Sequence, residues 1–314
     1  MRLSQFSDER LLKMVTTSAV IISLCLVGLK VYAVYLTHSV SMMASLVDSL
    51  MDVGASLINL IAIRVSLAPA DFEHRFGHGK AEALAGFCQS VIIGCSALYV
   101  FYHAYQQFVD PTAISHSGFG LIVSIIAIGM TIGLLLFQRY VIKRTNSPVV
   151  KADALHYFTD LLTNAGVVLA MIAVSLGILY VDAIVGVLIG VIIIKGSIEI
   201  GKQSVDILMD REHLLIEDED RFYQAVFSEE GVLGVHDLRS RQSGRDIFIQ
   251  LHLELPDEIS LREAHRISDA VECKLALAFP NTDIIIHEDP ISEVSDLVVK
   301  NRVRREEYFL NNKS

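Results

Sequence analysis

Six apolar stretches of about 20 residues or more constrain the fold of this 314-residue chain more than any other feature of its sequence. A helix of about 20 apolar residues crosses the hydrocarbon core of a bilayer and satisfies its own backbone hydrogen bonds there. A hydrophobic content of 52% and a mean hydropathy of +0.48 agree with a membrane protein. The predicted spans are residues 14–36, 40–67, 81–108, 119–141, 149–178 and 181–205.

The distribution of basic residues predicts the orientation of these spans. The linkers after the first, third and fifth spans read THS, VDPTAISHSG and LYVD, and they contain no Lys or Arg. The opposite side carries Arg2, Arg10, Lys13, Arg75, Lys80, Arg139, Lys143, Arg144, Lys151, Lys202 and Arg211. Because basic residues stay on the cytoplasmic side, both termini are predicted to be cytoplasmic. The polar segment 1–13 has no features of a removable signal peptide.

The composition changes at about residue 206, which predicts a domain boundary there. Residues 14–205 form the predicted transmembrane domain. In residues 206–290, helical and alternating strand patterns follow in the order α-β-β-α-β, which predicts an open α/β domain of the ferredoxin-like, metallochaperone-like class. Residues 291–314 form a charged tail. The net charge of −10 comes mainly from the last third of the chain, and no basic domain indicates nucleic-acid binding.

Two pairs of metal-ligand residues interrupt the apolar spans. Asp48 and Asp52 form one pair, and His156 and Asp160 form the other, each with i, i+4 spacing that places both side chains on one helix face. Charged groups inside a bilayer are costly and mark ion or proton pathways. Three carboxylates and one imidazole provide four ligands for a tetrahedral Zn²⁺-type site. The alternative is a set of hydrogen bonds between helices without metal, although neighbouring carboxylates then need protons.

Four other polar residues lie in the predicted spans. Asn59 and Asn164 are predicted to form hydrogen bonds between helices. Lys30 and Lys195 are predicted to extend their amines to the membrane interface.

The polar linker between the second and third spans contains a second candidate site. Asp71, His74 and His78 lie close together in PADFEHRFGHGKAEAL. Carboxylate and imidazole ligands at this spacing can hold Zn²⁺. The alternative is a solvated loop whose histidines have no particular role.

A third candidate site lies in the predicted α/β domain. Any one of its histidines, taken alone, would be interpreted as a histidine without a metal. Together with a nearby carboxylate they predict a site for one or two metal ions. The candidate ligands are His236, His252, His265, His287 and Asp289. His38, His103, His116 and His213 lack such partners and are interpreted as surface or interface residues.

The motifs SLVDSLMD, HRFGHGKAEAL and DALHYFTDLLTNAG, followed by an acidic α/β domain, resemble the cation diffusion facilitator family over about residues 8–290. The resemblance implies a homodimer in the bacterial inner membrane that exchanges a divalent metal ion for protons. It also implies a transport site of Asp48, Asp52, His156 and Asp160, and a loop site of Asp71, His74 and His78.

The resemblance further implies a binuclear cytoplasmic site. One metal is held by His236, His252 and Asp289, and the other by His265, His287 and a bridging Asp289. Glu288 lies between two of these ligands. The resemblance also implies a charge interlock between Lys80 and Asp210 that holds the dimer near the membrane surface.

These features favour a secondary active transporter, not an enzyme. We expect proton-coupled export of Zn²⁺, with Cd²⁺ and Fe²⁺ as further candidates, because an imidazole ligand suits these ions better than Mn²⁺. Three alternatives stay open: a channel, an intramembrane metallohydrolase and a metal-sensing receptor. A metallohydrolase needs an open coordination position and a general base, and the chain lacks an HExxH motif.

Overall fold

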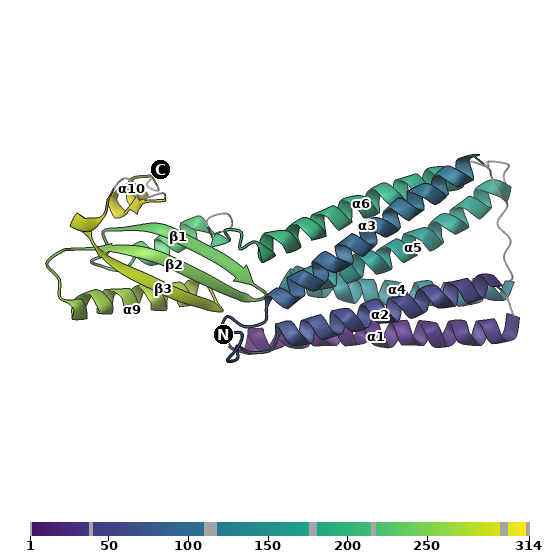
Figure 1. Ribbon diagram of the computed structural model, residues 1–314, viewed down its shortest axis with the longest axis horizontal. Helices are drawn as coiled ribbons and strands as arrows, with labels where there is room; N and C mark the ends of the chain where they lie inside the picture. The colour runs from purple at the N-terminus through teal and green to yellow at the C-terminus, as the bar shows by residue number, and fades with distance from the viewer. Residues whose placement is uncertain are drawn as a thin grey trace. The chain divides into compact units, whose positions relative to one another are not determined.

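The computed structural model describes residues 2–37, 40–109, 118–175, 181–214, 218–295 and 301–311. It divides into two compact units, Met1–Val205 and Asp206–Ser314. The first is a bundle of long helices and the second contains a four-stranded sheet (Figure 1). The predicted combination of a helical transmembrane domain and an α/β domain is confirmed.

Six long helices form the first unit. They are α1 (Arg2–Thr37), α2 (Val40–Ser66), α3 (Lys80–Val109), α4 (Gly118–Thr145), α5 (Pro148–Ser175) and α6 (Val181–Leu208). Within the described residues, α1, α2, α3, α4 and α6 contain stretches long and apolar enough to cross a membrane. The first half of α5 contains Lys151, Asp153, His156 and Asp160, so its polar content is concentrated there.

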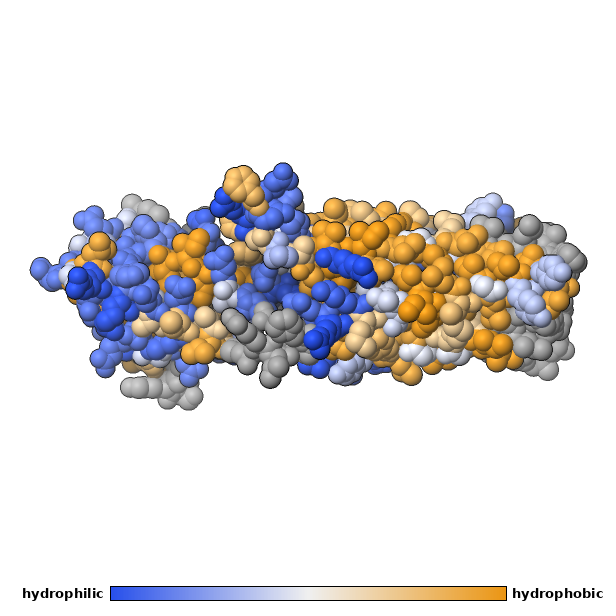
Figure 2. All heavy atoms as spheres, turned by 90° about the horizontal axis from the view of Figure 1, so that it is seen from below, coloured by the Kyte–Doolittle hydropathy of each residue, from blue (hydrophilic) through white to orange (hydrophobic). Residues whose placement is uncertain are grey.

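The bundle places many large apolar side chains outside and polar ones inside. Exposed residues include Ile21, Leu136 and Ile192, and the surface of the helical unit is largely apolar (Figure 2). Asn59 and Gln138, in contrast, are buried. Lipid contact explains this arrangement, because buried polar groups in a membrane need partners within the protein.

A tight connection fixes the antiparallel arrangement of α4 and α5. Asn146 adopts a left-handed conformation with φ of 53°, and its N–H donates to the carbonyl of Ile142. This is the hydrogen bond of a left-handed helix end. Ser147 then accepts from the N–H of Val150, and Pro148 occupies the first position of α5, which suits its fixed φ. The start of α5, which carries His156, is therefore well defined.

Small residues allow α6 to approach α3 closely. A Cβ atom added at Gly190 would lie 2.8 Å from the ring of Phe101, and one at Gly186 would lie 3.1 Å from Ala104. Ile93, Ala97, Ile189 and Ile193 belong to the buried apolar cluster at this part of the unit. Such packing of small residues is typical of helices that associate in lipid.

The second unit has the predicted α-β-β-α-β order and an additional C-terminal strand. Its elements are α8 (Glu219–Phe227), β1 (Gly234–Ser243), β2 (Asp246–Leu255), α9 (Leu261–Ala278), β3 (Thr282–Pro290), the 3₁₀ helix η1 (Ile291–Glu293), β4 (Val303–Arg304) and α10 (Arg305–Asn311). The strand order is β3-β2-β1-β4. β1 and β2 form an antiparallel hairpin, while α9 connects the parallel pair β2 and β3.

The amphipathic pattern of α9 and the alternation in β2 build the core of this unit. Ser260 accepts the N–H of Glu263 and caps the start of α9, and Val271 and Leu275 are buried. Ile249 and Leu251 of β2 are buried in the same core, which also contains the following side chains of α8 and the two strands: Phe222, Val226, Phe227, Val235 and Leu253. The helices therefore cover one face of the sheet. His252 alternates with the core residues of β2, so its side chain lies on the opposite face.

Candidate metal centres

The transmembrane cluster joins α2 to α5. His156 Nε2 lies 2.9 Å from Asp52 Oδ1 and 4.0 Å from Asp160 Oδ2. The ligand atoms of these three residues all lie within 4.8 Å of one another. The helical spacing of His156 and Asp160 places both side chains on one face of α5, which packs against α2. The side chain of Asp48 lies outside the described part of the structure.

A buried hydrogen-bond network holds the helices that carry this cluster. Asp153 Oδ1 accepts from Nδ2 of Asn59 at 2.9 Å, and its Oδ2 accepts from Nε2 of Gln138 at 2.6 Å. These bonds connect α5 to α2 and α4, and they confirm the predicted role of Asn59. Ser56 and Tyr157 share a further hydrogen bond of 3.0 Å between α2 and α5.

Sequence reasoning missed Asp153, although a signal was present. Asp153 is a further ionisable residue near the start of α5, three positions before His156, and its side chain is buried. A carboxylate in a predicted span calls for a polar partner, as it does at Asp160. The amides of Asn59 and Gln138 supply it. We therefore assign Asp153 to positioning and not to the ligand cluster.

The two lysines inside the predicted spans behave differently. Lys30 Nζ donates to Ser49 Oγ at 2.6 Å, which connects α1 to α2 in the turn before Asp52. Lys195 has an exposed side chain and lies 4.0 Å from Glu199 on the same helix. Lys30 therefore has a hydrogen-bond partner on a neighbouring helix, and its position at the membrane interface stays a prediction.

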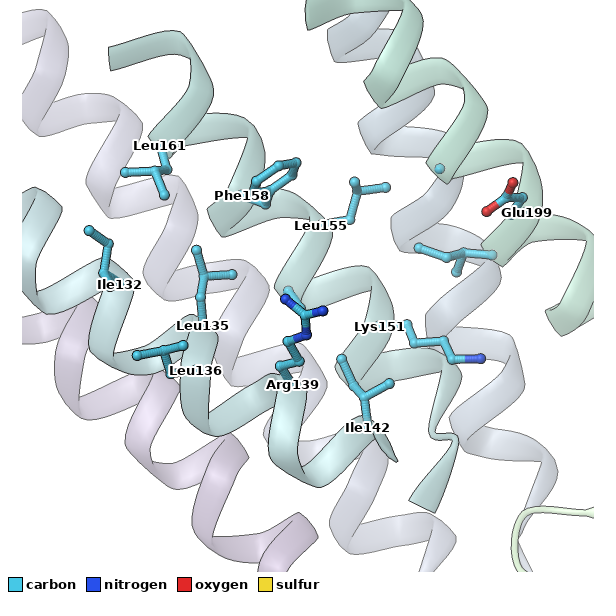
Figure 3. A pocket seen from close by; sticks show the side chains of 13 residues that line it. Ile132, Leu135, Leu136, Arg139, Ile142, Lys151, Leu155, Phe158, Leu161 and Glu199 are labelled. Atoms are coloured by element: carbon cyan, nitrogen blue, oxygen red, sulfur yellow. The ribbon is translucent and has the colours of Figure 1, made fainter. Parts of the chain in front are cut away.

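An apolar pocket of about 510 Å³ opens among α4, α5 and α6 (Figure 3). Leu136 and Phe158 line it, together with the charged residues Arg139, Lys151 and Glu199. None of the candidate metal ligands is among the residues described as lining this pocket. The pocket is consequently separate from the transmembrane cluster.

The loop between α2 and α3 brings its three candidate ligands together. Asp71 lies 3.4 Å from the nearest ring nitrogens of His74 and of His78. The two imidazole rings are 4.5 Å apart between centroids. The Asp71 carboxylate also accepts the backbone N–H groups of His74 and Glu73, and the His74 bond contributes most to lowering the pKa of Asp71. The loop therefore presents an ionised carboxylate beside two imidazoles.

Strand register brings the cytoplasmic histidines into one row. His236 of β1 pairs with His252 of β2, and His252 pairs with His287 of β3. The ring centroids of His236 and His252 are 5.0 Å apart, and those of His252 and His287 are 4.6 Å apart. Asp289 lies two residues beyond His287, on the same face of its strand. The row thus combines three imidazoles with one carboxylate.

Asp289 occupies the centre of this cluster. Its Oδ2 atom lies 2.7 Å from His252 Nδ1 and 3.3 Å from His236 Nε2, while its Oδ1 atom lies 3.2 Å from His287 Nε2. His236, His252 and Asp289 offer ligand atoms within 4.8 Å of one another. The two oxygens of Asp289 therefore face different histidines, as a bridging carboxylate would.

Three of the residues implied by the family pattern lie outside these clusters. His265 is on the exposed side of α9, and its Nε2 atom lies 3.5 Å from Asp269 one helical turn further on. Asp210 lies 3.3 Å from Arg241 within the second unit, whereas Lys80 begins α3 in the first unit.

Comparison with known proteins is consistent with this organisation. The cation efflux transmembrane domain matches residues 16–209, and the cytoplasmic domain of cation efflux proteins matches residues 216–291. The cation-efflux pump FieF of Escherichia fergusonii is 43% identical over 288 residues, covering 92% of this chain and 96% of the pump. FieF of Escherichia coli is 44% identical with the same coverage.

Among solved structures, the metal-bound C-terminal domain of the CzcD transporter from Thermotoga maritima is 20% identical, with a TM-score of 0.25, and covers 27% of this chain and 99% of that domain. The matched pumps are transporters and not enzymes. Because family models cover most of the chain and a full-length relative is 43% identical, the chain belongs to the cation efflux, or cation diffusion facilitator, family.

Proposed function

We propose that this membrane protein exports divalent metal ions, with Zn²⁺ as the main substrate, in exchange for protons. Asp48, Asp52, His156 and Asp160 would form the transport site. The observation that carries the proposal is the meeting of Asp52, His156 and Asp160 between α2 and α5, in the apolar part of the bundle. The similarity to pumps named for cation efflux supports the direction of transport.

Proton coupling follows from the chemistry of these ligands. A metal ion needs an ionised carboxylate and a neutral imidazole, so its binding releases protons. Protons arriving from the other side of the membrane would in turn displace the metal. The close approach of His156 to Asp52, at 2.9 Å, supports this exchange because the pair can share a proton when no metal is bound. Rocking of the helices would expose the site alternately to each side.

The imidazole ligand supports a substrate of the Zn²⁺ type. A site with one nitrogen and three carboxylate donors suits Zn²⁺, and Cd²⁺ and Fe²⁺ are further candidates. The proposed location is the bacterial inner membrane, with both termini in the cytoplasm. The support for this orientation is the concentration of Lys and Arg on one side of the predicted spans.

The cytoplasmic cluster would hold resident metal. Ligand atoms about 2.0–2.2 Å from one zinc ion lie roughly 3.3–3.6 Å apart at tetrahedral angles. Spacings of 2.7–3.3 Å from Asp289 to three imidazoles fit such a donor set after small adjustments. His236, His252 and Asp289 would hold one ion. Asp289 and His287 would hold another together with His265, although His265 lies on the exposed side of α9 beside Asp269 in the single chain. Metal there would stabilise the domain and a homodimer, with Lys80 and Asp210 as the charge interlock.

The loop cluster of Asp71, His74 and His78 is proposed as a further zinc site. Its support is the convergence of the three ligand atoms within 4.8 Å. All three side chains come from one short linker, so the cluster can form without contributions from the helices.

Zinc flux into proteoliposomes tests the proposal against its alternatives. A carrier should show saturable zinc flux that depends on an opposed pH gradient and releases protons in exchange. Flux that rises linearly with zinc concentration would indicate a channel. A protein that binds zinc but moves none under any gradient would be a receptor, and cleavage of peptide or lipid by the purified protein would indicate a hydrolase.

A further inference from the structure

The C-terminal segment lies beyond both family matches, the second of which ends at residue 291, yet it is built into the cytoplasmic sheet. β4 pairs with β1, where Val303 opposes Val235 and Arg304 opposes Gly234. The N–H of Arg305 donates to the carbonyl of Leu233 at 3.1 Å. Residues 303–305 therefore cover the start of the outer edge of β1, at Gly234 and Val235.

Side chains hold this segment against the core. The ring of Tyr308 on α10 lies 5.9 Å from that of Tyr223 and 5.4 Å from that of Phe227, and its hydroxyl donates to the carbonyl of Asp220. The Arg305 guanidinium donates to the carbonyl of Glu229 at 3.1 Å. Val303 also packs against the hydrophobic core. The C-terminal segment is thus docked by backbone, apolar and polar contacts together.

The docked segment brings a cation to a buried carboxylate behind the histidine row. Glu254 of β2 is fully buried, and its Oε1 atom lies 3.2 Å from Nε of Arg302. The same oxygen lies 3.2 Å from Nδ1 of His236. A Cβ atom at Gly234 would lie 2.5 Å from Glu254 Oε2, so a glycine makes room for this carboxylate. A buried carboxylate is costly without a charged partner, and Arg302 supplies one.

The two nitrogens of His236 thereby have different partners. Nδ1 faces Glu254, and Nε2 faces Asp289 in the candidate metal cluster at 3.3 Å. A metal-binding histidine characteristically donates its other ring N–H to a carboxylate, which fixes the ring orientation and strengthens the ligand. Glu254 is placed to perform this function for His236. The position of Glu254 in turn depends on Arg302, which lies outside the matched cytoplasmic domain, residues 216–291.

We propose that docking of residues 302–311 and metal binding at His236, His252 and Asp289 are coupled through the chain Arg302–Glu254–His236. This proposal rests on the proposed cytoplasmic metal site and assigns Arg302 and Glu254 as positioning residues for it. Metal on Nε2 fixes His236 as an Nδ1–H donor to Glu254, and Arg302 holds that carboxylate in place. Because coupling is reciprocal, the docked segment raises metal affinity and bound metal strengthens docking.

Full-length protein in detergent allows both sides of this coupling to be measured. Asp52→Ala and His74→Ala would silence the transport and loop sites, so that zinc competition with a chromophoric chelator reports the cytoplasmic cluster. Arg302→Gln should weaken zinc binding by about tenfold, the low end of the effect of removing an outer partner of a metal ligand, because Arg302 acts on His236 only through Glu254. Hydrogen exchange at residues 303–311 should become faster and no longer slow on addition of zinc.

Arg304→Gln is the matched control, because it removes the same charge two residues away and no ion pair of Arg304 is described in the structure. It should change neither zinc affinity nor the zinc-dependent protection of the segment. Equal affinity in Arg302→Gln and the parent would overturn the proposal. An equal loss in both arginine variants would also overturn it, since a general electrostatic effect of the segment would then explain the result.

A double-mutant cycle separates positioning from folding. Glu254→Gln should itself weaken zinc binding, and adding Arg302→Gln to it should cause little further loss, because the carboxylate that Arg302 holds is gone. Additive losses would overturn the proposed chain. Thermal unfolding without zinc identifies any variant that does not fold. Tyr308→Ala provides an independent test, because it weakens docking of the C-terminal segment without changing a residue that contacts Glu254. If the parent binds no zinc after the other two sites are silenced, the proposed cytoplasmic metal site is wrong, and so is the coupling that rests on it. The transport proposal is tested separately by zinc flux.

Discussion

His156 Nε2 lies 2.9 Å from Asp52 Oδ1 across the contact between α2 and α5. The two residues are 104 positions apart in the chain, so helix packing and not local sequence creates this pair. Asp160 lies on the same side of His156, with its Oδ2 atom at 4.0 Å. The transport proposal depends on this meeting of two helices.

Replacement of Asp52 by Ala is expected to abolish zinc transport, because the site loses a charged ligand that no other described carboxylate can replace at this distance from His156. The fold should survive, since a carboxylate facing a metal site is not a packing residue. Zinc flux in proteoliposomes is the measurement. Glu199→Gln is the control, because it removes a carboxylate from α6 that is exposed and outside the cluster. Normal flux in Asp52→Ala would refute the site.

His156→Asp is expected to shift the preference of the transporter from Zn²⁺ toward Mn²⁺. The substitution converts a mixed site into one with only oxygen donors, which suits harder cations. The ratio of Zn²⁺ to Mn²⁺ uptake into vesicles measures the shift, with His103→Asp as a control for an added carboxylate in a span. An unchanged ratio would show that site geometry, and not ligand type, determines selectivity.

Asp153→Ala is expected to destabilise the helical unit without removing a transport ligand. The substitution leaves the amides of Asn59 and Gln138 without their buried acceptor. Hydrogen bonds between helices in membrane proteins contribute about 0.6 kcal/mol on average, so the loss of two should cost roughly 1–2 kcal/mol. Thermal unfolding in detergent measures the cost. Asp153→Asn should lose less, because its amide retains one acceptor oxygen.

The long spans could be predicted from sequence because length and apolar composition are sufficient to identify a membrane helix. The role of Asp153 could not, because the partners that satisfy it come from two other helices. The row of His236, His252 and His287 depends on strand register, which the turn of the hairpin and the α9 crossover determine. Alternation in β2 indicated a half-buried strand, but Glu254 departs from this pattern.

Glu254 is buried because Arg302 and His236 both contact it, and neither contact is visible in a local pattern. β4 escaped prediction for a related reason. It is only two residues long, and most of its surroundings in the tail are charged. Its pairing with β1 arises from the docking of Tyr308 and Val303 on the core, which is a tertiary effect.

Stability of the cytoplasmic domain should depend on pH through Glu229. Lys274 Nζ lies 2.8 Å from this carboxylate and is the main cause of its lowered pKa, with Arg266 adding to the effect. A carboxylate whose pKa is lower in the folded state stabilises the fold above the ordinary value of 4.5, and this stabilisation disappears as pH falls through the lowered value.

Glu229→Gln should therefore lower the melting temperature of the domain at neutral pH and have progressively less effect below pH 4.5. Melting of the full-length protein followed across this range gives the comparison. Glu272→Gln, an exposed substitution on α9, is the control. If Glu229→Gln lowers the melting temperature by the same amount in acid as at neutral pH, the stabilisation does not come from the ion pair of Glu229.

Zinc in the cytoplasmic cluster should tune activity and stabilise the protein, because its ligands lie outside the predicted spans and cannot provide the crossing step. A ligand that binds only the folded state stabilises it by about 2.7 kcal/mol at a hundredfold excess over Kd. The combined replacement of His236, His252 and His287 by Ala should remove this zinc-dependent stabilisation while some proton-linked flux through the transmembrane site remains. The zinc-dependent melting shift is measured in full-length protein that also carries Asp52→Ala and His74→Ala, so that the transmembrane and loop sites do not contribute. Vesicle transport is measured in the triple variant without these two substitutions, and His213→Ala is the control for loss of a histidine in the same unit. A zinc-dependent melting shift that persists after the three histidines are replaced would refute the ligand assignment. If the triple variant folds and its transmembrane site still binds zinc, complete loss of transport would refute the modulatory role.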